Sequence, residues 1–473
     1  MKLLNSIDRS NHVVKTNYFI TLLCFLFILV FFSICYVLEL EFELSDFAWS
    51  LFFIGYVFFV YIFRYINKVN LVEIYSLFFV TTLIFMGGRF FAILLGYSAN
   101  PLFELDFFTY RLLNDKEKSL LMFLLFLGLA SLEVGFYFSK ILFKPNELRK
   151  NVKEIRANAL LFFMIFLVAI YVVYITYTNI NTVLKGGYLE LFIDSQNSGY
   201  SYNFLNNIQT LMYALVGIIC IQKNKNIQKL YLFILGAYFL GVIFTGSRGS
   251  FVCFILFLMW YFNDFGVRKV NALRVFTYFA LIFIGLNTVY YMFTLRKMST
   301  DLNDSLDFYQ KILQFLYDQG VSLFVFNESL YLSNYPIHQY FQNFFPGSTF
   351  IASLVSGDIR PENKSFVTYL NSELNPQLFE QGFGLGWAFF ADAYRYSFDI
   401  VYIYCIFIII FSIFINWLQL NLYRSRLVMV IASTTLIHVL FLPRGSLNTV
   451  FPLIFYTLIL YFLVISFKNK RSV

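Results

Sequence analysis

Charged residues are scarce in this chain. Asp, Glu, Lys and Arg together make up only 13% of its 473 residues. Hydrophobic residues make up 59%, and the mean hydropathy is +0.70. One soluble core could not bury this much apolar surface, so the composition excludes a soluble globular protein. It predicts an integral membrane protein that crosses the bilayer many times.

The sequence also lacks the patterns that usually hold metals or disulfides. Its five cysteines lie inside apolar runs and show no metal-ligand spacing: Cys24, Cys35, Cys220, Cys253 and Cys405. No Asp-x-Asp pair occurs, so we expect no metal site and no cofactor. The net charge of +8 does not imply nucleic acid as a partner, because most Lys and Arg residues fall in short loops, where they fix the topology.

Apolar runs of about 20 residues, the length that crosses a bilayer, recur along the whole chain. Loops rich in Lys and Arg alternate with loops that are acidic or mixed, which places both termini in the cytoplasm by the positive-inside rule. We predict twelve membrane-spanning helices, at residues 18–40, 47–66, 72–95, 119–142, 158–178, 207–222, 230–245, 249–263, 275–294, 398–420, 427–442 and 449–467.

The predicted helices divide the chain into three parts. Residues 1–295 hold the first nine helices, residues 296–397 form one long segment on the outer side, and residues 398–473 hold the last three helices. The long segment mixes Gly, Pro, Asn, Asp and Ser with apolar stretches, so we expect short helices that lie on the membrane surface. The predicted fold class is an all-α polytopic membrane protein with one large outer loop.

Two arginines interrupt the apolar sequence in the same way, in Gly246-Ser247-Arg248-Gly249 and in Pro443-Arg444-Gly445-Ser446. Both map to outer ends of predicted helices, where insertion into the membrane does not favour a cation. A guanidinium pairs with two phosphate oxygens at once, and glycine lets a ligand approach the backbone. These arginines therefore predict a site for a lipid-linked phosphate. The alternative is that each one contacts lipid headgroups or a nearby carboxylate.

Three motifs resemble those of the Wzy-type oligosaccharide repeat-unit polymerases, a family that includes O-antigen and enterobacterial-common-antigen polymerases. They are Thr245-Gly246-Ser247-Arg248-Gly249, Arg444-Gly445, and the glycine-rich stretch from Gly382 to Tyr394. The chain departs from the family pattern at two places. Asp392 stands where Glu is expected, and Arg395-Tyr396-Ser397-Phe398 replaces Asn-Phe-Gly after the tyrosine.

The resemblance implies a glycosyl transfer on the outer side of the bacterial inner (cytoplasmic) membrane. A growing glycan would leave its undecaprenyl pyrophosphate and join a new lipid-linked repeat unit. The implied partners are these two lipid-linked oligosaccharides, the lipid bilayer and a chain-length regulator. Pyrophosphate is expected to bind Arg89, Arg248, Arg296, Arg360 and Arg444. Further substrate contacts are expected at Gly246, Ser247, Gly249, Tyr394, Arg395, Gly445 and Ser446.

Such a reaction needs a base that accepts the proton of the acceptor hydroxyl. Asp392 is the first candidate, because it follows the glycine-rich stretch where the chain re-enters the membrane; it could instead form an ion pair with Arg395. Glu133 is predicted either to bond a neighbouring polar group or to line the substrate cavity. For His438, the prediction is an interhelical hydrogen bond rather than proton transfer. Reserve candidates for the base are Glu190, Glu328, His338 and Asp358.

Two other functions share most of these features. A flippase or exporter of lipid-linked sugar would also have many spans and intramembrane cations, but the long late outer loop argues against it. A ligase that transfers finished glycan to a lipid core would share nearly all of them. The sequence leaves the sugar, the linkage and the anomeric outcome open.

The alternation of basic and acidic loops gives a direct test of the topology. A reporter fused after Asn263 is expected in the cytoplasm, and one fused after Ser372 on the outer side. Alkaline phosphatase and fluorescent-protein fusions at both points measure this. Two reporters on the same side would contradict the predicted topology.

Overall fold

The computed structural model of the protein describes residues 2–105, 108–143, 158–186, 199–244, 248–265, 308–357 and 360–469. The described chain is almost entirely helical; the short strands β1 (Glu104–Leu105) and β2 (Arg111–Leu112) pair antiparallel. This confirms the all-α class. The chain forms two compact units. Unit 1 comprises Met1–Glu147, Asp307–Asn334 and Leu385–Asn421, and unit 2 comprises Leu148–Leu306, Tyr335–Gly384 and Leu422–Val473.

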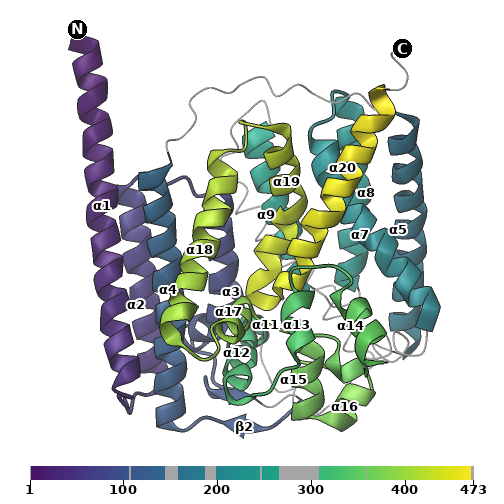
Figure 1. Ribbon diagram of the computed structural model, residues 1–473. Coiled ribbons are helices and arrows are strands. Elements are labelled where there is room, and N and C mark those ends of the chain that lie inside the picture. The colour runs from purple at the N-terminus through teal and green to yellow at the C-terminus, as the bar shows by residue number, and fades with distance from the viewer. Residues whose placement is uncertain are drawn as a thin grey trace. The chain divides into compact units, whose positions relative to one another are not determined.

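Unit 1 is built around helix α4. This helix packs against α1 on one side and α18 on another, while α3 packs against α2 and α11 (Figure 1). An Asn114–Glu117 capping box starts α4 and satisfies backbone donors of its first turn. The helices of unit 1 are α1 (Lys2–Val37), α2 (Asp46–Ile66), α3 (Ile74–Leu94), α4 (Asp115–Leu142), α11 (Phe308–Gln319), α12 (Ser322–Tyr331), α17 (Phe389–Tyr396) and α18 (Val401–Leu420).

Small residues let α4 and α18 approach closely. A Cβ atom on Gly135 would lie 2.5 Å from the Ile409 carbonyl oxygen. The Ser412 hydroxyl donates to the Leu132 carbonyl at 2.6 Å, and the Tyr404 hydroxyl donates to the Leu124 carbonyl at 3.1 Å. Close approach through small residues and interhelical hydrogen bonds is the usual way in which membrane helices associate.

A buried ion pair joins α2 to α4. Arg64 Nη2 lies 2.5 Å from Glu133 Oε1, and the two side chains are 1% and 0% exposed. The Tyr75 hydroxyl donates to the same oxygen at 2.9 Å, and the Arg64 guanidinium lies 4.1 Å from the centre of the Phe79 ring. Of the two alternatives for Glu133, the structure therefore shows bonding to neighbouring polar groups.

Unit 2 is built around α7 and α19. Helix α7 contacts α5, α19 and α20, and α9 contacts α8 and α19. Helices α7 and α19 meet where the Gly217 backbone N–H donates to Thr434 Oγ1 at 3.1 Å. The helices of unit 2 are α5 (Ala159–Gly186), α7 (Gly199–Cys220), α8 (Lys225–Phe244), α9 (Arg248–Phe265), α13 (Ile337–Gln342), α14 (Ser348–Ser356), η1 (Pro361–Asn363), α15 (Phe366–Leu374), α16 (Pro376–Glu380), α19 (Arg426–Phe441), η2 (Leu442–Arg444), η3 (Leu447–Thr449) and α20 (Phe451–Asn469).

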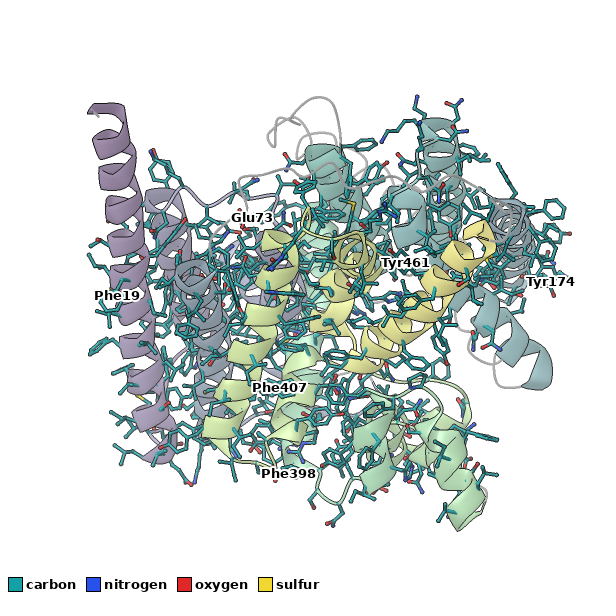
Figure 2. The ribbon with its side chains drawn as sticks, turned by 45° about the horizontal axis from the view of Figure 1, so that its top comes forward. Phe19, Glu73, Tyr174, Phe398, Phe407 and Tyr461 are labelled. Atoms are coloured by element: carbon teal, nitrogen blue, oxygen red, sulfur yellow. The ribbon has the colours of Figure 1, made fainter. Side chains whose placement is uncertain are left out.

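Within the described residues, nine helices are long and apolar enough to cross a membrane: α1, α2, α3, α4, α5, α8, α18, α19 and α20. Large apolar side chains such as Phe19 of α1 and Tyr174 of α5 are exposed on their surfaces (Figure 2). The predicted span 207–222 corresponds to α7, whose apolar part, Leu205–Cys220, is shorter. The span 249–263 corresponds to α9, and the span 275–294 lies outside the described residues. Twelve spans therefore stay a prediction.

The long segment predicted at 296–397 forms short helices of 5 to 12 residues where the structure describes it. Helices α11, α12 and α17 belong to unit 1, whereas α13 to α16 belong to unit 2. The segment thus contributes to both units. Large apolar side chains of α14 are exposed, which suits helices at a membrane surface: Phe350, Ile351, Leu354 and Val355.

The ion pair between Arg64 and Glu133 gives a prediction about stability. Replacing Glu133 by Ala leaves a buried guanidinium without its carboxylate, which is expected to destabilise the protein by about 3–5 kcal/mol. Thermal unfolding of the purified protein in detergent measures this. The double variant Arg64→Met/Glu133→Met removes both charges and is expected to recover much of the loss. A Glu133→Ala protein as stable as the wild type would contradict the assigned role of the pair.

Candidate functional site

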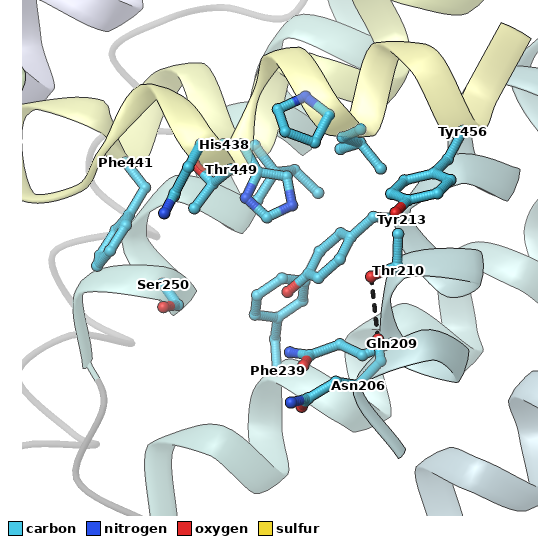
Figure 3. A pocket seen from close by; sticks show the side chains of 14 residues that line it. Asn206, Gln209, Thr210, Tyr213, Phe239, Ser250, His438, Phe441, Thr449 and Tyr456 are labelled. Atoms are coloured by element: carbon cyan, nitrogen blue, oxygen red, sulfur yellow. Dashed lines mark hydrogen bonds between the residues drawn. The ribbon is translucent and has the colours of Figure 1, made fainter. Parts of the chain in front are cut away.

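Unit 2 contains a cavity of about 470 Å³ (Figure 3). Its lining is polar and aromatic. Amide and hydroxyl groups come from Asn206, Gln209, Thr210, Ser250, Asn448 and Thr449. Rings come from Tyr213, Phe239, His438, Phe441 and Tyr456, and the remaining lining residues are Ile437, Pro452 and Leu453. No Asp, Glu, Lys or Arg side chain is among these lining residues.

Helix periodicity explains why these residues meet. On α7, Gln209 and Thr210 follow Asn206 by three and four residues and precede Tyr213 by four and three, so the four residues share one face of that helix. Residues at similar spacing near the C-terminal end of α19 and near the N-terminal end of α20 also line the cavity. The cavity therefore lies where helix ends of unit 2 converge, at the ends that the sequence predicts to lie on the outer side of the membrane.

Hydrogen bonds and ring contacts order the lining. Gln209 Nε2 donates to the Tyr238 hydroxyl at 2.7 Å, and Thr210 Oγ1 donates to the Asn206 carbonyl at 2.9 Å (Figure 3). The ring of His438 meets that of Tyr213 edge-on, with centroids 4.3 Å apart and planes at 70°. These contacts hold the two rings against each other inside the cavity.

Both arginine motifs are close in the sequence to residues that line this cavity, although neither arginine is itself among the lining residues. Helix α9 begins at Arg248, two residues before Ser250, so the arginine stands at the first turn that reaches the cavity. Arg444 ends η2, between the lining residues Phe441 and Asn448. Both arginines are partly exposed, and Gly249 is buried. Gly246 and Ser247, also predicted as substrate contacts, lie outside the described residues.

The turn after Arg444 is held by its own side chains. The Ser446 hydroxyl caps η3 and donates to Asn343 Oδ1 at 3.4 Å, while Thr449 Oγ1 donates to the Ser446 carbonyl at 2.8 Å. A Cβ atom on Gly445 would lie 3.3 Å from the Phe441 ring, so the turn packs closely on the end of α19. These contacts fix where the backbone beside Arg444 lies.

Other arginines predicted to bind pyrophosphate are placed differently. Arg89 in unit 1 is 2% exposed and donates from Nη1 to the carbonyl oxygens of Leu102 and Glu104. Its guanidinium lies 4.2 Å from the Tyr317 ring centre, so this cation stabilises contacts within unit 1. In unit 2, Arg360 is 80% exposed beside Glu362 and does not line the cavity. Arg296 lies outside the described residues.

Asp392 lies in unit 1, on α17, and none of its surface is exposed. Its Oδ1 accepts a hydrogen bond from the Trp387 indole at 2.8 Å. Arg395, which the sequence suggested as an ion-pair partner, lies 2.6 Å from Asp399 Oδ1 and donates to the Leu332 carbonyl at 3.0 Å. The surroundings of Asp392 are those of a structural acceptor.

The predicted substrate contact Tyr394 is also nearly buried. Its ring packs against Phe326 and Tyr404. Burial raises the pKa of the Tyr394 phenol most, and the electrostatic effect of the Tyr36 hydroxyl raises it further. The Tyr394 hydroxyl therefore stays protonated at physiological pH.

Two reserve candidates for the base also have partners. The carboxylate of Glu328, which is 4% exposed, accepts hydrogen bonds from Arg111 Nη1 at 3.1 Å and from Asn327 Nδ2 at 3.0 Å. His338 Nε2 lies 2.6 Å from the Asn363 carbonyl oxygen and thereby connects α13 to η1. Glu190 and Asp358 lie outside the described residues. Nowhere in the described ranges do three His, Cys, Asp or Glu residues gather as they would around a metal.

Sequence reasoning missed most of the cavity lining. A polar stripe at helical spacing precedes the apolar run of α7 and is formed by Asn206, Gln209 and Thr210. This stripe is the sequence pattern that could have indicated a polar cavity. Asn448 and Thr449 follow the Arg444 motif after one intervening residue, Leu447. These segments are more than two hundred residues apart, and no pattern in the sequence indicates that they share one cavity.

Comparison with known proteins agrees with these features. The family model of the O-antigen polysaccharide polymerase Wzy matches residues 18–472, nearly the whole chain. No curated protein and no solved structure matches the chain significantly. Because the family match includes both arginine motifs and every helix that contributes to the cavity, the chain belongs to the O-antigen polysaccharide polymerase Wzy family.

Proposed function

We propose that this protein joins undecaprenyl-pyrophosphate-linked oligosaccharide repeat units into a surface polysaccharide on the periplasmic side of the inner membrane. The observation that carries the proposal is the cavity of unit 2, whose lining residues Ser250, Phe441 and Asn448 are close in the sequence to Arg248 and Arg444. Membership of the family supports polymerisation of O-antigen repeat units in general.

The lining of the cavity suits a sugar. Amide and hydroxyl groups can exchange hydrogen bonds with sugar hydroxyls, and the rings of Tyr213 and Tyr456 offer apolar faces for the C–H groups of a pyranose. A volume of about 470 Å³ is within the usual range for small-molecule sites. Because the lining side chains include no carboxylate, lysine or arginine, we expect an uncharged sugar in this cavity.

The two arginines suit the pyrophosphate of the donor. Negative charge builds up on the pyrophosphate as its bond to the anomeric carbon breaks, and a fixed guanidinium stabilises that charge. The backbone N–H groups at the first turn of α9, where Arg248 stands, add partial positive charge at the same end. In the predicted topology both motifs lie at the outer boundary of the membrane, where the headgroup of the lipid carrier lies.

A ligase would use the same donor, so the assay has to separate the two functions. A purified protein given only a synthetic undecaprenyl-pyrophosphate repeat unit has no lipid-core acceptor. Products of two or more joined repeat units support the polymerase. A protein that binds the repeat unit and never extends it would contradict the proposal.

Lysine at either arginine position keeps the charge but loses the two-pronged hydrogen bonding of guanidinium. We expect Arg248→Lys and Arg444→Lys to reduce the polymerisation rate by roughly 10²–10³-fold, as the loss of one oxyanion donor typically does. Arg426→Lys, at the opposite end of α19, is the matched control and is expected to keep the wild-type rate. Full polymer length and rate from both test variants would remove the arginines from the proposed site.

Asp392 gives a second test, because sequence and structure suggest different roles for it. If Asp392 is the base, its replacement by Asn would reduce the polymerisation rate by about 10²–10⁴-fold. An asparagine carbonyl can still accept from the Trp387 indole, so the structural role leads us to expect a rate within a few-fold of the wild type. Polymerisation in membranes with matched protein levels decides between them. Asp392→Ala is the control, since an unpaired indole N–H is expected to reduce stability by about 1–3 kcal/mol.

A further inference from the structure

His438 is placed differently from the other ionisable side chains considered as bases. It lies on α19 and lines the cavity of unit 2, with its imidazole beside the ring of Tyr213 (Figure 3). An ionisable side chain within a membrane-spanning helix normally pairs with another group or faces a cavity. The sequence predicted an interhelical hydrogen bond for His438. Across the described ranges, neither of its ring nitrogens makes a hydrogen bond, and its neighbour is an aromatic ring.

We propose that His438 is the base that takes the proton from the acceptor hydroxyl. This assignment rests on the proposed polymerase function. The edge-on contact with Tyr213 fixes the orientation of the imidazole without using either nitrogen. Asp392 and Glu328, by contrast, already accept hydrogen bonds from side chains of unit 1, and His338 is bonded to a backbone carbonyl.

The position of His438 along α19 fits this role. It lies in the last turn of α19, six residues before Arg444, which ends η2. In the proposed complex the two arginines hold the pyrophosphate and the attached sugar lies in the cavity that His438 lines. The base has to reach the acceptor hydroxyl that attacks the anomeric carbon of that sugar.

The groups around His438 leave it suited to accept a proton. The titratable groups that line the cavity with it are Tyr213 of α7 and Tyr456 of α20, and the charged groups of the bordering turns are Arg248 and Arg444. Among the described residues that line the cavity there is no carboxylate. Neutral imidazole is the ordinary form of histidine at neutral pH, and it is the form that accepts a proton.

One glycosidic bond forms by exchange at the anomeric carbon of the donor. The hydroxyl oxygen of the non-reducing sugar of the acceptor attacks the anomeric carbon of the donor and forms the new C–O bond. The bond from that carbon to the pyrophosphate oxygen breaks, and its electron pair leaves with the pyrophosphate. The hydroxyl proton moves to His438, which becomes imidazolium and later returns the proton to water. No oxidant or further reactant is needed.

The test uses the purified full-length protein and a synthetic undecaprenyl-pyrophosphate repeat unit, with polymerisation rate and Kd measured separately. His438→Gln is expected to lower the rate by about 10²–10⁴-fold and to leave the Kd within a few-fold of the wild type. Added imidazole is expected to restore part of the rate of His438→Ala, because that substitution leaves space for it. Thr435→Val is the control on the same helix: it loses a hydroxyl that bonds the Ile431 carbonyl, does not line the cavity, and should polymerise normally.

The assignment is overturned by near-normal polymerisation in His438→Gln, by equal losses of rate and binding, or by the absence of imidazole rescue. A wild-type protein that binds the repeat unit and forms no polymer would instead overturn the proposed function.

Discussion

Water is absent from the core of a bilayer, so every polar side chain within a membrane-spanning helix has to be bonded inside the protein or face a polar cavity. The two units meet this constraint in different ways. In unit 1, Arg64, Glu133 and Tyr75 bond to one another and are almost fully buried. In unit 2, Gln209 and His438 line a cavity. The first arrangement joins helices, and the second provides room for a ligand.

The same constraint determines how firmly the cavity is held. Helices α7 and α19 approach each other at Gly217, whose backbone N–H bonds Thr434, and both helices then continue to the cavity. At the end of α19, the contacts of Ser446 and Gly445 fix the turn that carries Arg444. Side chains on packed helices and on a tightly held turn keep their geometry better than side chains on long loops, which is what electrostatic stabilisation of a transition state requires.

The sequence predicted the class of fold well, because hydropathy and loop charge report directly on membrane insertion. It also drew attention to Arg248 and Arg444, since a cation beside glycine in an apolar run stands out. The sequence did not distinguish these two arginines from Arg89. Only the three-dimensional structure shows that the Arg89 side chain donates to the Leu102 and Glu104 carbonyls. The cavity could not be predicted either: its lining residues run from Asn206 to Tyr456, and hydropathy does not tell which apolar helix faces pack together.

The lipid carrier of the proposed donor gives a reason for this arrangement. Its polyprenyl tail stays in the bilayer, so its pyrophosphate is confined to the level of the headgroups and its sugar cannot move freely into bulk solvent. An enzyme for such a donor has to bring its cations to the helix ends and its sugar-binding groups to the same boundary. Arg248 at the first turn of α9, Arg444 at the turn after α19, and the polar stripe of α7 meet this requirement within one unit. A histidine in the last turn of α19, before Arg444, is costly in lipid. In the proposed reaction it is useful there, because the cavity that would receive the sugar would also receive the hydroxyl from which the proton is taken.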